Sequence, residues 1–155
     1  MTKALLAFLL LYAITASAST TETLKTVASI EETNAVFVEL SRRSGLGKAE
    51  LKSLLADCSA SQQNMHFCAW RDQIEANQKL GLILAERAQK SPKCKPTLKS
   101  KVSRWERMRD QSCNKSTKRQ WGEGSMKPTA EAMCIAAETE KMIKRLDAAH
   151  GCNIR

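Results

Sequence analysis

The segment from residue 97 to residue 113 reads TLKSKVSRWERMRDQSC and contains neither proline nor glycine. Its apolar residues recur every three or four positions, which places on one helical face Leu98, Val102, Trp105 and Met108. Cys113 ends the segment, where a disulfide would fix the helix to a neighbouring element. We therefore expect an amphipathic helix over about residues 97–113 with its apolar face in the core.

Further helices are expected upstream, because alternating strand patterns are scarce. Residues 22–42 have helical composition but no clear apolar face, and a short helix follows with one stripe: Leu51, Leu54, Leu55 and Cys58. Ser61 is a plausible N-cap for a long helix over about residues 62–89, which Pro92 and Pro96 would end. The stripe expected to be buried on that helix is Met65, Cys68, Ala69, Ala76, Leu80, Ile83 and Leu84.

Downstream, the polar residues 114–125 are expected to form a long loop. A final helix should begin near Pro128, which suits a first helical turn, and end near Ala149. The residues expected to point inward are Met133, Ala137, Met142 (or Ile143) and Leu146. The fold class expected from these patterns is all-α, a small disulfide-stabilised bundle of about four to five helices.

The cysteines are six, an even number, and they are widely spaced: Cys58, Cys68, Cys94, Cys113, Cys134 and Cys152. Structural zinc sites use close cysteine pairs, and none occurs here, so we expect no metal and no cofactor. In an exported chain such cysteines indicate a disulfide framework. The aromatic content of 5% also leaves the core mainly aliphatic, which makes covalent links useful.

Helix order favours one pairing of the cysteines. Helices joined by short loops are antiparallel, and the separations from residue 94 to 113 and from 134 to 152 are nearly equal, 19 and 18 residues. The economical pairing is therefore Cys94–Cys152 and Cys113–Cys134, which leaves Cys58–Cys68. A permuted pairing of the four cysteines Cys58, Cys68, Cys113 and Cys134 stays open.

The N-terminus has the form of a cleaved signal peptide. Lys3 precedes an apolar run over residues 4–14, and Ala16-Ser17-Ala18 has the small-x-small pattern of a cleavage site. The run is shorter than the roughly 20 residues of a membrane span, so an anchor is the weaker reading. We expect residues 1–18 to be removed, residues 19–57 to form a helical extension, and the mature protein to be periplasmic or extracellular without a membrane span.

Charge leaves two interpretations. The full chain carries a formal +9, or +8 without Lys3. The surplus predicts either a soluble cationic surface or a site for anionic partners. Many of the cationic residues lie between residues 95 and 119: Lys95, Lys99, Lys101, Arg104, Arg107, Lys115, Lys118 and Arg119. Nucleic acid is not favoured, because few aromatic side chains are available for stacking.

Catalytic motifs are lacking. The sequence contains no glycine-rich phosphate loop, no His-Glu-x-x-His pattern and no Gly-x-Ser-x-Gly elbow. His66 and His150 have no evident partner, and the acidic pairs are typical of solvated helix faces. We therefore expect no catalytic residue and no enzyme activity.

One set of motifs is more specific. It consists of Met65-His66-Phe67-Cys68-Ala69, Ala76-Asn77-Gln78-Lys79-Leu80, Trp105-x-x-x-Arg109-Asp110-x-x-Cys113, Gly122-Glu123-Gly124-Ser125, and Cys134 with Thr139 and Leu146. This set resembles the LprI-like lysozyme-inhibitor family over about residues 58–146. The chain departs from the family pattern at Asn77, Gly81, Val102 and Met142, and Cys94 and Cys152 are additional.

The resemblance implies a bacterial envelope protein with a disulfide-rich domain over residues 58–155 that binds and blocks a host or wall-degrading lysozyme. The candidate structural motif is Trp105, Arg109 and Asp110, in which Arg109 can pair with a neighbouring acid. The candidate partner-binding loop is Trp121, Gly122, Glu123, Gly124, Ser125 and Met126, although it could merely turn the chain. The alternative is a cationic envelope module that binds anionic polymers without inhibiting an enzyme.

Overall fold

In this computed structural model the described residues are 34–149 and 152. The chain divides into two compact units, residues 1–35 and 36–155. Of the first unit only residues 34 and 35 are described, and both are helical. The expected signal peptide over residues 1–18, most of the helix expected over 22–42, and His150 lie outside the described residues. The second unit contains the remaining described residues, 36–149 and 152.

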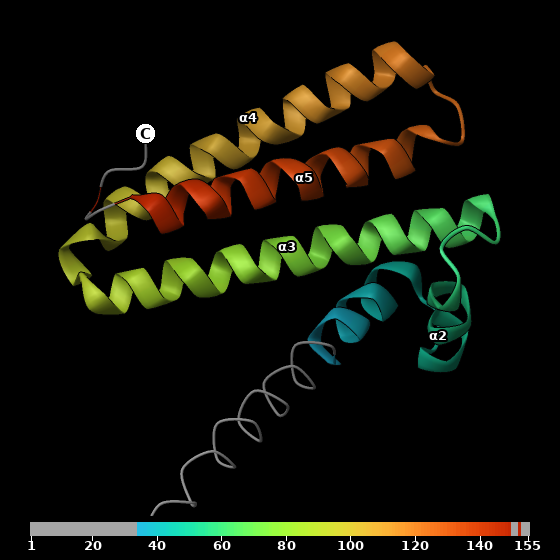
Figure 1. Ribbon diagram of the computed structural model, residues 1–155, viewed down its shortest axis with the longest axis horizontal. Helices are drawn as coiled ribbons and strands as arrows, with labels where there is room; N and C mark the ends of the chain where they lie inside the picture. The colour runs from blue at the N-terminus through green and yellow to red at the C-terminus, as the bar shows by residue number, and fades with distance from the viewer. Residues whose placement is uncertain (1–33, 150–151, 153–155) are drawn as a thin grey trace, which may run out of the picture. The chain divides into compact units, whose positions relative to one another are not determined.

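The described part of this unit contains helices and no strand. Residues 36–44 are helical and are followed by α2 (Lys48–Ala56), α3 (Gln62–Lys90), the short 3₁₀ helix η1 (Pro92–Cys94), α4 (Lys95–Trp121) and α5 (Lys127–Ala148). Helix α4 runs antiparallel to α3, and α5 runs antiparallel to α4 and in the same direction as α3, in contact with both (Figure 1). The all-α class and the number of helices expected from the sequence are confirmed.

Local sequence signals set the ends of α3. The Ser61 side chain accepts a hydrogen bond from the Asn64 backbone N–H at 3.1 Å, which satisfies one donor of the first turn. The Asn64 side-chain amide then donates to the Leu54 carbonyl at 2.9 Å and connects α3 to α2. At the other end, Ser91 precedes Pro92, and the chain passes through η1 into α4. The N-cap expected at Ser61 is confirmed.

Two groups of buried side chains hold the helices together. The first joins residues 36–44 and α2 to the N-terminal half of α3 and consists of Val36, Leu40, Leu51, Phe67 and Ile74. The second joins α3, α4 and α5 and consists of Leu80, Val102, Met142, Ile143 and Leu146. Helix α5 contacts both α3 and α4, so the second group is the core of a three-helix bundle.

The expected loop over residues 114–125 is wrong for most of its length, because α4 continues to Trp121. This stretch has no proline or glycine before Gly122. Its polar side chains find partners within the helix: Thr117 Oγ1 donates to the Cys113 carbonyl at 2.8 Å, and Ser116 Oγ donates to the same carbonyl at 3.0 Å. Polarity alone therefore did not end the helix, and the connection to α5 shortens to residues 122–126.

Several side chains expected in the core lie on the surface instead. Met108 is 62% exposed and Met133 is 59% exposed, and Met65 and Ala137 are also exposed. The buried faces of α4 and α5 include polar residues. Arg109 on α4 and Thr139 on α5 are buried and hydrogen-bonded to each other. Reasoning from apolar spacing alone excluded such residues from the core, although Leu98, Val102, Met142 and Leu146 are buried as expected.

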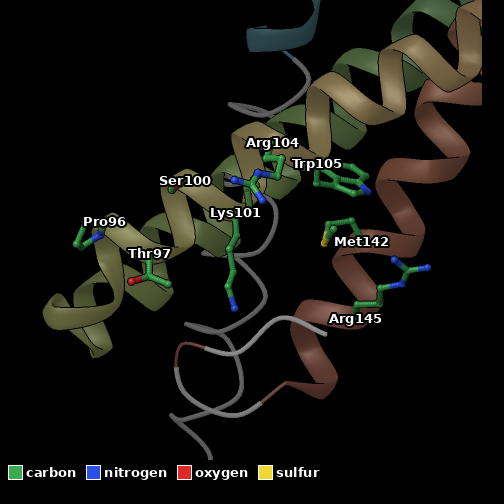
Figure 2. A pocket seen from close by; sticks show the side chains of 9 residues that line it. Pro96, Thr97, Ser100, Lys101, Arg104, Trp105, Met142 and Arg145 are labelled. Atoms are coloured by element: carbon green, nitrogen blue, oxygen red, sulfur yellow. The ribbon is translucent and has the colours of Figure 1, made fainter.

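Trp105 lies at the edge of the core rather than within it. It packs against the second buried group but is only partly buried. Its indole ring lies under the guanidinium of Arg109, whose central carbon is 5.0 Å from a ring centroid. Figure 2 shows Trp105 on α4 opposite Met142 on α5, at the side of a groove between these helices.

The favoured disulfide pairing is confirmed. The three bonds are Cys58–Cys68, Cys94–Cys152 and Cys113–Cys134, and no described cysteine is free. Cys94 in η1 and Cys152 after α5 meet at one end of the bundle, as the matched helix lengths predict. At this end Arg87 of α3 also donates to the carbonyls of Leu146 and Ala149, which satisfies acceptors at the C-terminus of α5.

Candidate functional site

The candidate partner-binding segment, residues 121–126, forms the connection between α4 and α5, and we call it the α4–α5 tip. Trp121 is the last residue of α4, and Gly122 follows at φ +60°, a conformation that L side chains rarely adopt. The Gly122 N–H donates to the Lys118 carbonyl at 2.9 Å and ends the helix. Gly124 and Lys127 then close two successive turns through bonds to the carbonyls of Trp121 and Gly124.

Charged side chains brace the tip from both helices. Glu123 accepts from Lys118 of α4 at 2.8 Å and from Lys127 of α5 at 3.0 Å. Hydrogen bonds from these two lysines lower the pKa of Glu123 to about 2, from an ordinary value of 4.5. Because the carboxylate is engaged twice, neither lysine is an unpaired cation, and the tip is not acidic.

The tip nevertheless presents groups that could contact a partner. The Trp121 side chain is 43% exposed, an uncommon situation for a large aromatic ring. Within the described part of the chain the Ser125 hydroxyl and backbone N–H have no hydrogen-bond partner. An apolar ring and two neutral donors therefore lie within a few residues of one another on a turn fixed by hydrogen bonds and ion pairs.

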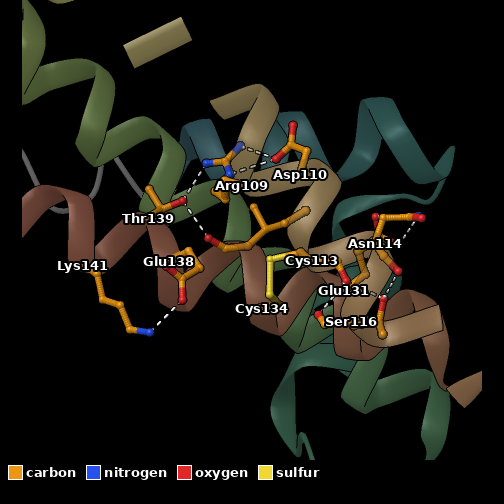
Figure 3. The surroundings of a disulfide bond; sticks show 12 residues. Arg109, Asp110, Cys113, Asn114, Ser116, Glu131, Cys134, Glu138, Thr139 and Lys141 are labelled. Atoms are coloured by element: carbon orange, nitrogen blue, oxygen red, sulfur yellow. Dashed lines mark hydrogen bonds and ion pairs between the residues drawn. A yellow bond between two sulfur atoms is a disulfide. The ribbon is translucent and has the colours of Figure 1, made fainter. Parts of the chain in front are cut away.

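A disulfide links α4 and α5 close to the tip. Cys113 of α4 and Cys134 of α5 are linked about two helical turns before and after the connection. Beside this bond, Asn114 donates to the Glu131 carboxylate at 3.3 Å, and the two residues come from the same pair of helices (Figure 3). The spacing between α4 and α5 is thus covalently fixed close to the tip.

The motif residues Arg109 and Asp110 form a structural network. Arg109 is 8% exposed and pairs with Asp110 at 2.8 Å. Its Nη1 donates to Thr139 Oγ1 of α5 at 2.7 Å and to Asn77 Oδ1 of α3 at 2.9 Å (Figure 3 for Thr139). One guanidinium therefore connects α3, α4 and α5, and no buried side-chain nitrogen or oxygen atom of the described residues lacks a partner.

His66 has partners that the sequence did not reveal. Its Nδ1 is 3.4 Å from Thr129 Oγ1 on α5, and its ring centroid is 5.3 Å from that of Trp70. Burial lowers the pKa of His66, which favours the neutral imidazole. This contact joins the N-terminal turns of α3 and α5 and, among the residues that the structure describes, brings no second acid or base to the ring.

The motif set quoted above now lies on three mutually packed helices, and the comparison with known families agrees with it. Residues 56–146 match the family described as Lysozyme inhibitor LprI. The chain belongs to this family. No curated protein and no solved structure matches the chain at a significant level.

The LprI region begins at the last residue of α2 and ends at Leu146 in α5, so it contains α3, α4, the α4–α5 tip and the Arg109 network. Cys94 lies within it, whereas Cys152 lies beyond it. The LprI description names an enzyme as the partner and inhibition as the effect. Three disulfides and a lysozyme-inhibitor family are both consistent with an exported protein.

Two further properties of the described residues bear on the site. No helix there combines the length and apolar character of a membrane span. No cluster of three or more histidine, cysteine, aspartate or glutamate side chains in residues 34–149 and 152 could hold a metal ion. Sequence reasoning missed Asn77 and Thr139 as partners of Arg109, although both belong to the quoted motifs. Their place in the same set of motifs as Arg109 was the available signal.

Proposed function

We propose that this LprI-family chain is a non-catalytic, exported inhibitor of a lysozyme-type glycosidase, and that the α4–α5 tip enters the enzyme's cleft. The observation that best supports the tip as the binding site is that Trp121 is exposed on a turn whose Glu123 pairs with a lysine of each flanking helix. A rigid turn loses little conformational entropy on binding, which favours affinity.

The chemistry of the cleft suggests which groups contact it. Glycosidases of this type hold two carboxyl groups at the scissile bond. The Ser125 hydroxyl and N–H are free to donate to such a carboxylate, whereas Lys118 and Lys127 are engaged by Glu123. Trp121 then supplies the buried aromatic contact that commonly dominates binding energy.

Charge determines which lysozymes are suitable targets. Helix α4 carries nine basic and two acidic residues, a formal +7 within a chain of +9. A strongly basic lysozyme would be repelled during approach, so association should be slow and should accelerate when salt screens both charges. A neutral or acidic lysozyme would associate without this barrier.

The uneven charge also supports a second candidate function, the binding of anionic envelope polymers. Only Arg109 and Lys118 of α4 make ion pairs within residues 34–149 and 152. The α4 cations without an ion pair there are Lys95, Lys99, Lys101, Arg104, Arg107, Lys115 and Arg119. A polymer held by these residues would release counterions, so its binding would weaken steeply with salt.

A panel of lysozymes of different isoelectric point, assayed on cell-wall substrate with the oxidised protein at several salt concentrations, tests both functions. The inhibitor proposal expects reduced hydrolysis for at least one enzyme, with inhibition of basic enzymes maintained or faster at high salt. Hydrolysis unaffected across the panel would reject it. Binding to anionic wall polymer that disappears with salt, without any inhibition, would favour the second function.

A further inference from the structure

A groove of about 760 Å³ lies between α4 and α5, away from the α4–α5 tip. Its volume is within the range of small-molecule sites, about 300–1,000 Å³. Apolar side chains from both helices line one part of it: Val102 and Trp105 from α4, and Met142 from α5. These three side chains belong to or pack against the second buried group, so the bundle's own core holds the groove in place.

Cations surround this apolar lining. Lys101 and Arg104 of α4 and Arg145 of α5 line the groove, and none of its lining residues within the described part of the chain is an aspartate or a glutamate. In Figure 2, Lys101 and Arg104 project from α4, and the Arg145 side chain extends from α5 on the other side of Met142. Lys101 and Arg104 are three residues apart, so α4 presents two cations on one side, whereas α5 presents one cation, Arg145, three residues after the apolar Met142.

None of the three cations makes an ion pair within the described part of the chain. Most described ion pairs of this protein join close sequence neighbours, and α4 has too few acids to neutralise itself. Three unpaired cations beside an apolar recess give a strongly positive potential there. The complementary molecule is anionic at one end and apolar at the other.

We propose that this groove binds a single anionic amphiphile, an acyl chain that carries a phosphate or carboxylate head. The tail contacts Val102, Trp105 and Met142, and the head accepts hydrogen bonds from Arg104 and Arg145. The proposal is independent of lysozyme inhibition, because the groove and the α4–α5 tip share no residue.

Titration calorimetry of the full oxidised chain with dodecyl phosphate below its micelle concentration tests this site. Dodecyl phosphate and dodecanoate should each bind with 1:1 stoichiometry, and both inorganic phosphate and dodecanol should bind at least about tenfold more weakly, since each lacks one half of the recognition. Equal binding of inorganic phosphate would overturn the proposal. So would association only with anionic phospholipid vesicles, because the charged face of α4 would then act without the groove.

Variants locate the site. The double variant Arg104→Gln/Arg145→Gln should weaken dodecyl phosphate binding at least about tenfold. The matched control Lys99→Gln/Arg107→Gln removes the same charge from described surface positions that do not line the groove, and it should retain most of the affinity. Equal losses in both variants would overturn the proposal.

A further variant tests whether the acyl chain of the ligand lies in the groove. Ser100 is exposed at the rim, so Ser100→Trp should block the groove at an unchanged melting temperature. Undiminished dodecyl phosphate binding by this variant would contradict the assignment. Loss of lysozyme inhibition in the Arg104→Gln/Arg145→Gln variant would also contradict it, because the groove would then be part of the protein-binding surface.

Discussion

Arg109 on α4 donates a hydrogen bond to Thr139 on α5 at 2.7 Å, in the interior of the three-helix bundle. The Thr139 hydroxyl in turn donates to the Ile135 carbonyl at 2.7 Å, so the acceptor of the guanidinium is itself fixed. The motif that identifies the family therefore contains a positioning residue for the helices. Partner recognition lies elsewhere in our account.

Replacing Arg109 should be costly, whereas replacing its exposed partner should not. Arg109→Met removes the donors to Asn77 and Thr139, and we expect a loss of about 1–3 kcal/mol in the free energy of unfolding. Asp110 is exposed, so Asp110→Asn should cost less than about 1 kcal/mol. Chemical denaturation measures both, and equal losses would show that Arg109 acts only through its surface ion pair.

Two glycines should respond in opposite directions to alanine. At Gly122, φ +60° with ψ −136° is nearly restricted to glycine, so Gly122→Ala should destabilise the fold by about 1–3 kcal/mol. Gly81 lies within α3 with no atom near an added Cβ, so Gly81→Ala should stabilise it by about 0.5–1 kcal/mol. Thermal unfolding of both variants checks this pair, and a neutral Gly122→Ala would mean that the tip is not held as described.

Trp121 should be needed for inhibition but not for folding. Trp121→Ala should weaken inhibition of a responsive lysozyme roughly thirtyfold, or about 2 kcal/mol, with little change in the melting temperature. Met108→Ala is the matched control, since it removes another exposed apolar side chain of α4 away from the tip. Inhibition by Trp121→Ala equal to that of the parent would direct the search for the recognition surface to a helix face.

Acid should leave the tip intact until an unusually low pH. The pKa of Glu123 is lowered to about 2, so its ion pairs contribute fully above the ordinary glutamate value of 4.5 and are lost as pH falls through about 2. The side-chain carboxyl signal of Glu123 in an NMR titration should therefore still report the ionised form at pH 3. A midpoint near 4.5 in the parent protein would refute the double ion pair with Lys118 and Lys127.

Much of the fold was predictable because its signals are local. Proline, glycine and the Ser61 cap placed most helix ends, and matched cysteine separations gave the pairing Cys94–Cys152 and Cys113–Cys134. The end of α4 was missed because a polar segment was interpreted as a loop. Its side-chain bonds to the Cys113 carbonyl arise only once the helix has formed.

The buried faces were harder to predict for a different reason. The inward position near the middle of α4 belongs to Arg109, which is stable there only because Asn77 and Thr139 come from two other helices. No pattern within α4 reveals those partners, so Met108 was the natural choice. The candidate tip could be placed from sequence, but the bracing of Glu123 by Lys118 and Lys127 depends on the helix that was not expected there.

The kinetic mode of inhibition tests the central claim most directly. Initial rates of a responsive lysozyme on a soluble oligosaccharide substrate, measured at several concentrations of the oxidised protein, separate cleft occupation from action at a distance. Because the α4–α5 tip and the substrate would compete for one cleft, apparent KM should rise with inhibitor concentration while kcat stays constant. A fall in kcat at constant KM, or no inhibition of any lysozyme tested, would contradict the account.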